Sequence, residues 1–277
     1  MNITFYNGNQ MPKVGIGTFR VKNDEDAKNA VKHAIKNGYR SIDTAMIYQN
    51  EEMVGQGIHE ALEETNLQRD DLFITSKLWL TDYGYENVEA AYKASLNRLG
   101  LDRLDLYLMH WPGLDESLMV ETWKGMEMLY EKGLVDNIGV SNFNVEHLDR
   151  LLSEAKIKPV INQVEYHPYL TQSRLKDYLE AQHIQMESWS PLMNAQILTD
   201  TVVNEIAREV NHSPAQVIIR WNIQNGVVTI PKSVTPSRIN ENINVFDFEL
   251  TQDQMERLDQ LNKDKRIGPN PLEFNGQ

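Results

Sequence analysis

Apolar and polar positions alternate in blocks along this chain. Short runs dominated by apolar residues are followed by longer stretches in which apolar residues recur at helical spacing. Short apolar runs are typical of buried strands, and the longer period is typical of helices that cover them. Strands are predicted at Val14–Thr18, Tyr39–Asp43, Leu72–Lys77, Leu104–Met109, Val135–Val140, Val160–Glu165, Ile184–Trp189 and Val227–Pro231. Helices are predicted at Asp24–Asn37, Glu51–Thr65, Tyr85–Leu99, Leu118–Glu131, Val145–Glu154, Gln172–Gln182, Thr201–Val210 and Pro214–Gln224.

This alternation, repeated about every thirty residues, favours a parallel α/β sheet that closes as a (β/α)8 TIM barrel. Ahead of the first strand, apolar residues flank Asn7-Gly8-Asn9, which predicts an N-terminal β-hairpin. The tail from Asn262 to Gln277 has no helical or strand period, so it is predicted to be a loop or a partly free end. No linker divides the chain, and residues 1–277 are therefore predicted to form one domain.

Composition narrows the function classes. The chain has no cysteine, which excludes disulfides and cysteine-based metal sites and favours a reducing, cytoplasmic location. The formal net charge of -13 argues against nucleic acid as a partner, although a local basic pocket can still bind an anionic cofactor. The N-terminus does not resemble a signal peptide, and no apolar run is long enough for a membrane span. A soluble protein without a membrane partner is expected.

Four polar residues follow or end neighbouring predicted strands. Asp43 ends the second strand, Tyr48 lies in the loop after it, Lys77 ends the third strand, and His110 follows the fourth. Each residue alone is most often structural or solvated. Together they suit proton chemistry, because a phenol needs a neighbouring cation to become a stronger acid, and strand ends converge at one barrel face.

The motifs around these residues extend over nearly the whole chain. They are MPKVGIGTF, GYRSIDTAMIYQNEEMVG, FITSKLW, LDLYLMHWP, IGVSNF, NQVEYHP and IPKSVTPSRINEN. In content and order they resemble the aldo-keto reductase family. Phe19 stands where many relatives carry Trp, which resembles the bacterial branch that includes diketogluconate and methylglyoxal reductases. The pair Gly15-x-Gly17 lacks the third glycine of a Rossmann fingerprint, and the family binds NAD(P)H without that fingerprint.

The resemblance implies NADPH-dependent reduction of aldehydes and ketones, including small dicarbonyls such as methylglyoxal or diketo sugar acids. Tyr48 would donate the proton, Lys77 would lower the Tyr48 pKa, Asp43 would orient Lys77, and His110 would orient the substrate oxygen. The substrate pocket would be lined by Phe19, Tyr48, Trp79, His110 and Trp111. Short loops and a short tail suggest that this pocket is open.

The same resemblance assigns the NADPH/NADP+ contacts. At the nicotinamide these are Ser141, Asn142 and Gln163, with Trp189 stacking on the ring. Further contacts along the cofactor are Thr18, Asp43, Ser190 and Leu192. Around the adenosine phosphate they are Lys232, Ser233, Val234, Arg238 and Asn242. Lys232 and Arg238 suit the ribose 2′-phosphate that distinguishes NADP from NAD. By themselves these two cations would be interpreted as a solvated helix start.

Two other functions remain open at this point. A cofactor-sensing protein on the same fold, like the potassium-channel β-subunits, keeps the same four residues. The short loops and the lack of an extended N-terminal segment argue against it. A metal-dependent barrel enzyme would need His and carboxylate ligands at converging strand ends, where only Asp43, His110 and Glu165 qualify. The resemblance implies a monomer, and no exposed apolar heptad or amphipathic stretch argues otherwise.

Overall fold

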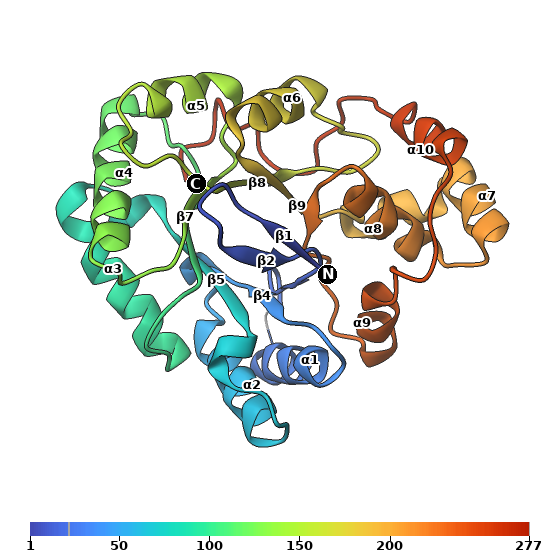
Figure 1. The fold of residues 1–277 in the computed structure, drawn as a ribbon, viewed down its shortest axis with the longest axis horizontal. Coiled ribbons are helices and arrows are strands. Elements are labelled where there is room, and N and C mark those ends of the chain that lie inside the picture. Colours follow the sequence, from blue (N-terminus) through green and yellow to red (C-terminus); the bar gives the residue numbers. More distant parts are fainter. Residues whose placement is uncertain (22, 277) are drawn as a thin grey trace.

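The computed structural model describes residues 1–21 and 23–276, and an eight-stranded parallel sheet forms its centre (Figure 1). Neighbouring strands in the sheet follow one another in chain order. The strands are β3 (Ile16–Gly17), β4 (Ser41–Asp43), β5 (Phe73–Leu78), β6 (Leu106–Met109), β7 (Ile138–Ser141), β8 (Ile161–Glu165), β9 (Gln185–Trp189) and β10 (Val228–Thr229). The predicted strand order is confirmed, although the first and last strands are shorter than predicted.

Backbone contacts between the first and last strands close the sheet into a barrel. Val14 pairs in parallel with Thr229, and the Gly15 N–H donates to the Thr229 carbonyl at 2.9 Å. A Cβ on Gly17 would lie 2.9 Å from the carbonyl oxygen of Ile230. This glycine therefore permits a close approach of two strands.

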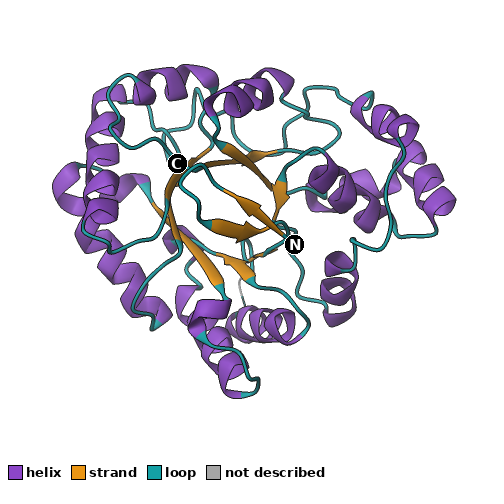
Figure 2. Cartoon of the chain, in the orientation of Figure 1, coloured by secondary structure: helices purple, strands orange, loops and turns teal. Residues whose placement is uncertain are grey.

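Helices form a ring outside the barrel (Figure 2). They are α1 (Asp24–Lys36), α2 (Glu51–Glu63), α3 (Tyr85–Leu99), α4 (Glu116–Glu131), α5 (Val145–Leu152), α6 (Ser173–Gln182), α7 (Thr201–Val210), α8 (Pro214–Gln224), α9 (Pro236–Ile243) and α10 (Gln252–Asp259). Short 3-10 helices are η1 (Met46–Tyr48), η2 (Arg69–Asp71), η3 (Leu80–Asp82) and η4 (Met193–Thr199). The eight predicted helices are confirmed with small shifts at their ends. In the described part of the chain, no helix is both long and apolar enough to cross a membrane.

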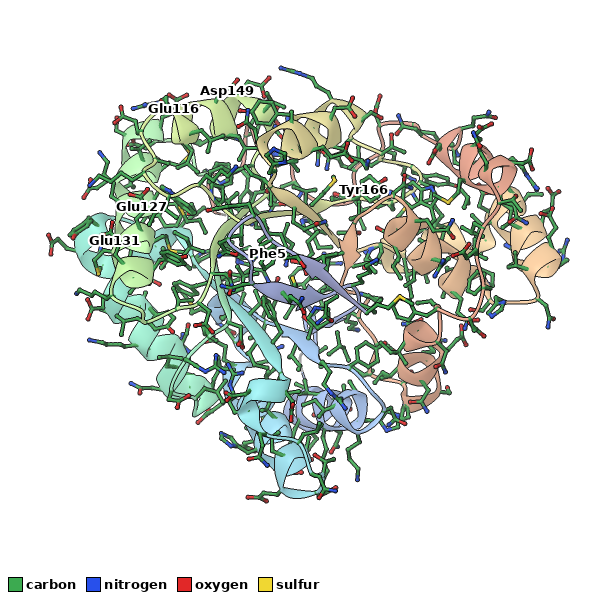
Figure 3. All side chains as sticks on the ribbon, viewed as in Figure 1. Phe5, Glu116, Glu127, Glu131, Asp149 and Tyr166 are labelled. Carbon is green, nitrogen blue, oxygen red and sulfur yellow. The ribbon has the colours of Figure 1, made fainter. Side chains whose placement is uncertain are left out.

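The predicted N-terminal hairpin consists of β1 (Asn2–Thr4) and β2 (Gln10–Pro12), paired antiparallel. Phe5 follows β1 and lies over the middle of the barrel in the view of Figure 3. It belongs to a buried apolar cluster with Leu106 and Val228, which begin their strands. The hairpin therefore covers the N-terminal end of the barrel. The active site of such a barrel lies at the opposite end, where the C-terminal ends of the strands meet.

The C-terminal tail, residues 262–276, is a loop as predicted, and hydrogen bonds tie part of it to the barrel. The carboxylate of Glu165 accepts the backbone N–H groups of Ile267 at 2.7 Å and Gly268 at 3.0 Å. The Tyr169 carbonyl accepts the Lys265 N–H at 3.0 Å. These hydrogen bonds hold the tail against the C-terminal ends of the strands. Gln277 lies outside the described residues.

Candidate active site

A buried chain of polar contacts forms the floor of the site. Lys77, on β5, donates from Nζ to Asp43 Oδ1 at 2.6 Å and to the Thr44 carbonyl at 2.9 Å. Its Nζ also lies 3.3 Å from the hydroxyl of Tyr48, at the end of η1. Lys77 is fully buried, and Asp43 is nearly so. The three residues predicted to act together are therefore in direct contact.

The pKa of Tyr48 is raised in this floor, whereas the sequence predicts that Lys77 lowers it. Burial lowers the pKa of Lys77, but Asp43 and Tyr48 raise it above its ordinary value, so Lys77 stays charged. Burial raises the pKa of Tyr48 to about 12, and Lys77 offsets this only in part. Lys77 thus lowers the Tyr48 pKa as predicted, but burial raises this pKa by more. Tyr48 stays protonated at neutral pH, as a proton donor must.

His110 follows β6 and forms the wall beside Tyr48. Its ring centroid lies 5.5 Å from that of Tyr48 and 5.0 Å from that of Trp79. Burial first, and then the charge of Lys77, hold the pKa of His110 well below its ordinary value. The imidazole is therefore neutral at pH 7, and a neutral imidazole can donate a hydrogen bond to a substrate oxygen.

Aromatic side chains surround the opening above this floor. The cavity has a volume of about 400 Å³, and its lining includes Phe19, Trp79, Trp111 and Phe274 together with Tyr48 and His110. Phe19 lies 5.0 Å from Tyr48 between ring centroids, and Trp111 lies 4.2 Å from Phe274. The predicted substrate-side residues are thus brought together around one apolar pocket.

A polar network forms the adjacent wall. Asn142 Nδ2 donates to the His110 carbonyl at 3.0 Å, and Asn142 Oδ1 accepts the indole N–H of Trp189 at 2.8 Å. Ser141 Oγ donates to the carbonyl of Gln163 at 2.8 Å. Ser141, Asn142, Gln163 and Trp189 all line the cavity, and the hydrogen bonds of Asn142 hold its amide and the Trp189 indole in place in this wall.

A second cleft, of about 490 Å³, continues from the first. Ser190, Asn194 and Lys232 line both. The second cleft is also lined by Leu192, Ser233, Val234, Arg238 and Asn242. Among the described residues, the side chains of Lys232 and Arg238 have neither an ion-pair nor a hydrogen-bond partner. Two adjoining clefts whose lining includes two such cations fit an anionic dinucleotide.

The sequence was compared with known protein families. A model described as "Aldo/keto reductase family" matches residues 13–263. The chain belongs to the aldo/keto reductase family. Among curated relatives, glyoxal reductase of Bacillus subtilis is 55% identical over 272 residues, covering 98% of this chain and 96% of that protein. Methylglyoxal reductase DkgA of Escherichia coli K12 is 44% identical over 276 residues, covering 99% and 98%.

Solved structures of other aldo/keto reductases share the fold. A Gox0644 mutant in complex with NADPH matches with a TM-score of 0.93 and 41% identity, covering 99% of this chain and 98% of that one. A Bombyx mori aldo-keto reductase in complex with NADP matches with a TM-score of 0.92 and 36% identity, covering 97% and 95%. The predicted family and barrel fold are confirmed by these matches.

One predicted cofactor contact of this aldo/keto reductase, that of Thr18, stays a prediction. Thr18 is buried and lines neither cleft, and its hydroxyl donates to the Asp43 carbonyl at 3.0 Å. Among the described residues, no group of three or more His, Cys, Asp or Glu side chains could hold a metal ion. Glu165, considered above as a metal ligand, instead binds backbone N–H groups of the tail.

Several residues of the site were not predicted, among them Glu187 and Phe274. Glu187, on β9, is fully buried and accepts Gln163 Nε2 at 2.8 Å, while the same nitrogen donates to Asp43 Oδ2 at 2.8 Å. In the sequence, the only indication that Glu187 belongs to the site is its position in a predicted strand, two residues before Trp189. Phe274 lies in the aperiodic tail, where nothing in the sequence indicates that it reaches the pocket.

Proposed function

We propose that this protein is an NADPH-dependent reductase that converts aldehydes and ketones to alcohols, with Tyr48 as the proton donor. The observation that carries the proposal is the contact of Tyr48 with Lys77 at 3.3 Å on the floor of a buried aromatic pocket. A protonated phenol beside a fixed cation suits a reaction in which negative charge develops on a carbonyl oxygen.

NADPH would supply hydride to the carbonyl carbon when bound. Tyr48 then donates its proton to the developing alkoxide, and Lys77 stabilises the phenolate that remains. Asp43 keeps Lys77 charged and aimed at Tyr48 through its 2.6 Å contact. His110 is neutral and can donate a hydrogen bond to the same oxygen, so it orients the carbonyl without adding charge.

The chain itself provides suitable groups for each end of the cofactor. Ser141, Asn142 and Gln163 form a polar wall beside Trp189, and we assign them to the nicotinamide, with Trp189 as the stacking surface. At the other end, Lys232 and Arg238 would pair with the ribose 2′-phosphate. The second cleft is also lined by Ser190, Leu192, Ser233, Val234 and Asn242. Support comes from relatives of the same fold that were solved with NADPH or NADP.

Cofactor preference tests this assignment. Wild type is expected to oxidise NADPH far more efficiently than NADH with methylglyoxal as substrate. In Arg238→Ala the KM for NADPH is expected to rise about tenfold or more, while the KM for NADH stays nearly unchanged. An equal rise of the KM for NADPH and for NADH would show that Arg238 does not bind the 2′-phosphate.

We propose small carbonyls and dicarbonyls as the substrate class, because the pocket is small and aromatic and the curated relatives are named glyoxal and methylglyoxal reductases. Residues 1–277 would act as one domain, since contacts from both ends of the chain close the barrel. The monomeric state and the cytoplasmic location remain predictions.

A further inference from the structure

Glu165 is a buried carboxylate that lines neither cleft and is not used by the proposed reaction. It ends β8 and is fully buried, as is His167 two residues later. Glu165 Oε1 lies 2.9 Å from His167 Nε2 and accepts the Ile267 N–H at 2.7 Å. Glu165 Oε2 accepts the Gly268 N–H at 3.0 Å. Both carboxylate oxygens are therefore committed to one place in the tail.

Hydrogen bonds of this kind make the ionised carboxylate a strong anchor. Burial raises the pKa of Glu165, but the hydrogen bonds from His167 and from the two tail N–H groups lower it below its ordinary value overall. Hydrogen bonds to a charged acceptor are stronger than those between neutral groups. The tail is further tied by Arg266, whose guanidinium donates to Gln172 Oε1 at 3.1 Å.

The anchored segment forms one wall of the carbonyl pocket. Ile267, Gly268 and Phe274 line the same cavity as Tyr48. Gly268 lies so close to Trp189 that a Cβ would come within 2.4 Å of the indole. Phe274 packs on Trp111, with 4.2 Å between ring centroids. The position of these rings, and hence the width of the pocket, depends on where the tail is held.

We propose that Glu165 is a positioning residue that clamps the C-terminal tail over the pocket and thereby determines which carbonyl substrates fit. The proposal rests on the proposed function, because it concerns the same pocket. With the tail clamped, Phe274 and Trp111 enclose a small carbonyl and exclude water around it. With the clamp released, the aromatic wall becomes mobile, and small substrates lose more binding than bulky ones.

Glu165→Gln breaks the clamp with little change in volume. If the amide oxygen keeps the Ile267 contact, the amide nitrogen must face the Gly268 N–H, and two donors cannot pair. The matched control is Glu273→Gln, which neutralises an exposed carboxylate of the same tail.

The first readout needs no enzyme activity. Trypsin cuts after Arg266, and the Ile267 N–H on the other side of that bond is held by Glu165 in the wild type. Release of the 267–277 peptide, followed by mass spectrometry, is expected to be about tenfold or more faster in Glu165→Gln than in wild type or Glu273→Gln. Equal cleavage rates in all three proteins would overturn the clamp.

The second readout is substrate selectivity. In Glu165→Gln the KM for methylglyoxal is expected to rise about tenfold with kcat changed less than about twofold, while 1-naphthaldehyde is affected much less. Phe274→Ala is expected to shift selectivity in the same direction. The double variant should then resemble Phe274→Ala alone, because Glu165 acts through the tail.

Two outcomes would contradict the role of Glu165 in substrate specificity. One is a released tail with unchanged selectivity, and the other is a double variant in which the effects of Glu165→Gln and Phe274→Ala simply add. If wild type reduces no carbonyl at all, the proposed function is wrong, and the proteolysis result still decides whether Glu165 clamps the tail.

Discussion

Replacing Glu187 by Gln tests whether the floor of the barrel holds a protonated carboxyl. Glu187 Oε2 accepts Gln163 Nε2 at 2.8 Å, and Oε1 has no hydrogen-bond partner among the described residues. Lys77, whose charge acts on Glu187, is paired with Asp43 at 2.6 Å. Burial and then the negative charge of Asp43 raise the pKa of Glu187 to about 8, against the opposing effects of Gln163 and Lys77.

The sign of the pH effect follows from proton binding. Between the ordinary pKa of 4.5 and about 8, the folded protein holds a proton on Glu187 that the unfolded chain has released. The stability from this group is therefore fully present below 4.5 and falls as the pH rises to about 8. Each pKa unit corresponds to about 1.4 kcal/mol, which gives about 4–5 kcal/mol across the whole window.

Urea unfolding at about pH 5 and about pH 8 measures this effect. Glu187→Gln keeps the shape of the protonated side chain but cannot ionise, so its unfolding free energy should exceed that of wild type by about 3–4 kcal/mol more at the higher pH. Glu180→Gln, at an exposed position of α6, controls for the loss of a carboxylate elsewhere. The same pH dependence in wild type and Glu187→Gln would refute a protonated Glu187.

Three further substitutions test the floor, the cofactor cleft and the hairpin. Lys77→Met should lower the unfolding free energy by about 3–5 kcal/mol in urea titrations, because Asp43 is left as an unpaired buried charge. Adding Asp43→Asn should recover part of that loss without restoring turnover. Lys232→Ala should weaken NADPH binding in fluorescence titrations about tenfold, and less so at high salt, because an exposed charge pair is screened. Phe5→Ala should cost about 3–5 kcal/mol of stability with an unchanged KM for NADPH, since the hairpin lies at the opposite end of the barrel.

Much of the fold follows from local patterns in the sequence. The strands are short apolar runs between amphipathic helices, and this periodicity places Asp43, Lys77 and His110 at strand ends that meet on one face. Two helices, α9 and α10, are absent from the predicted set, although Thr251 and Gln254 form a capping box at the start of α10. Its stretch is strongly polar, so the apolar period that identifies other helices is weak there.

The rest of the site depends on contacts between distant parts of the chain. Glu187 looks like any polar residue in a strand until the barrel closes and buries it beside Asp43, with Gln163 between them. Phe274 reaches the pocket because the tail folds back over the strand ends, where Glu165, about a hundred residues earlier, accepts two of its backbone N–H groups. The high pKa of Tyr48 likewise comes from burial, which motif spacing does not reveal.

Reduction of methylglyoxal by wild type and Tyr48→Phe, with NADPH binding measured on both proteins, tests the central claim most directly. The account predicts that Tyr48→Phe binds NADPH as tightly as wild type but loses nearly all turnover, because the only change is the loss of the phenolic hydroxyl beside Lys77. Comparable turnover in the two proteins would contradict the assignment of Tyr48 as the proton donor.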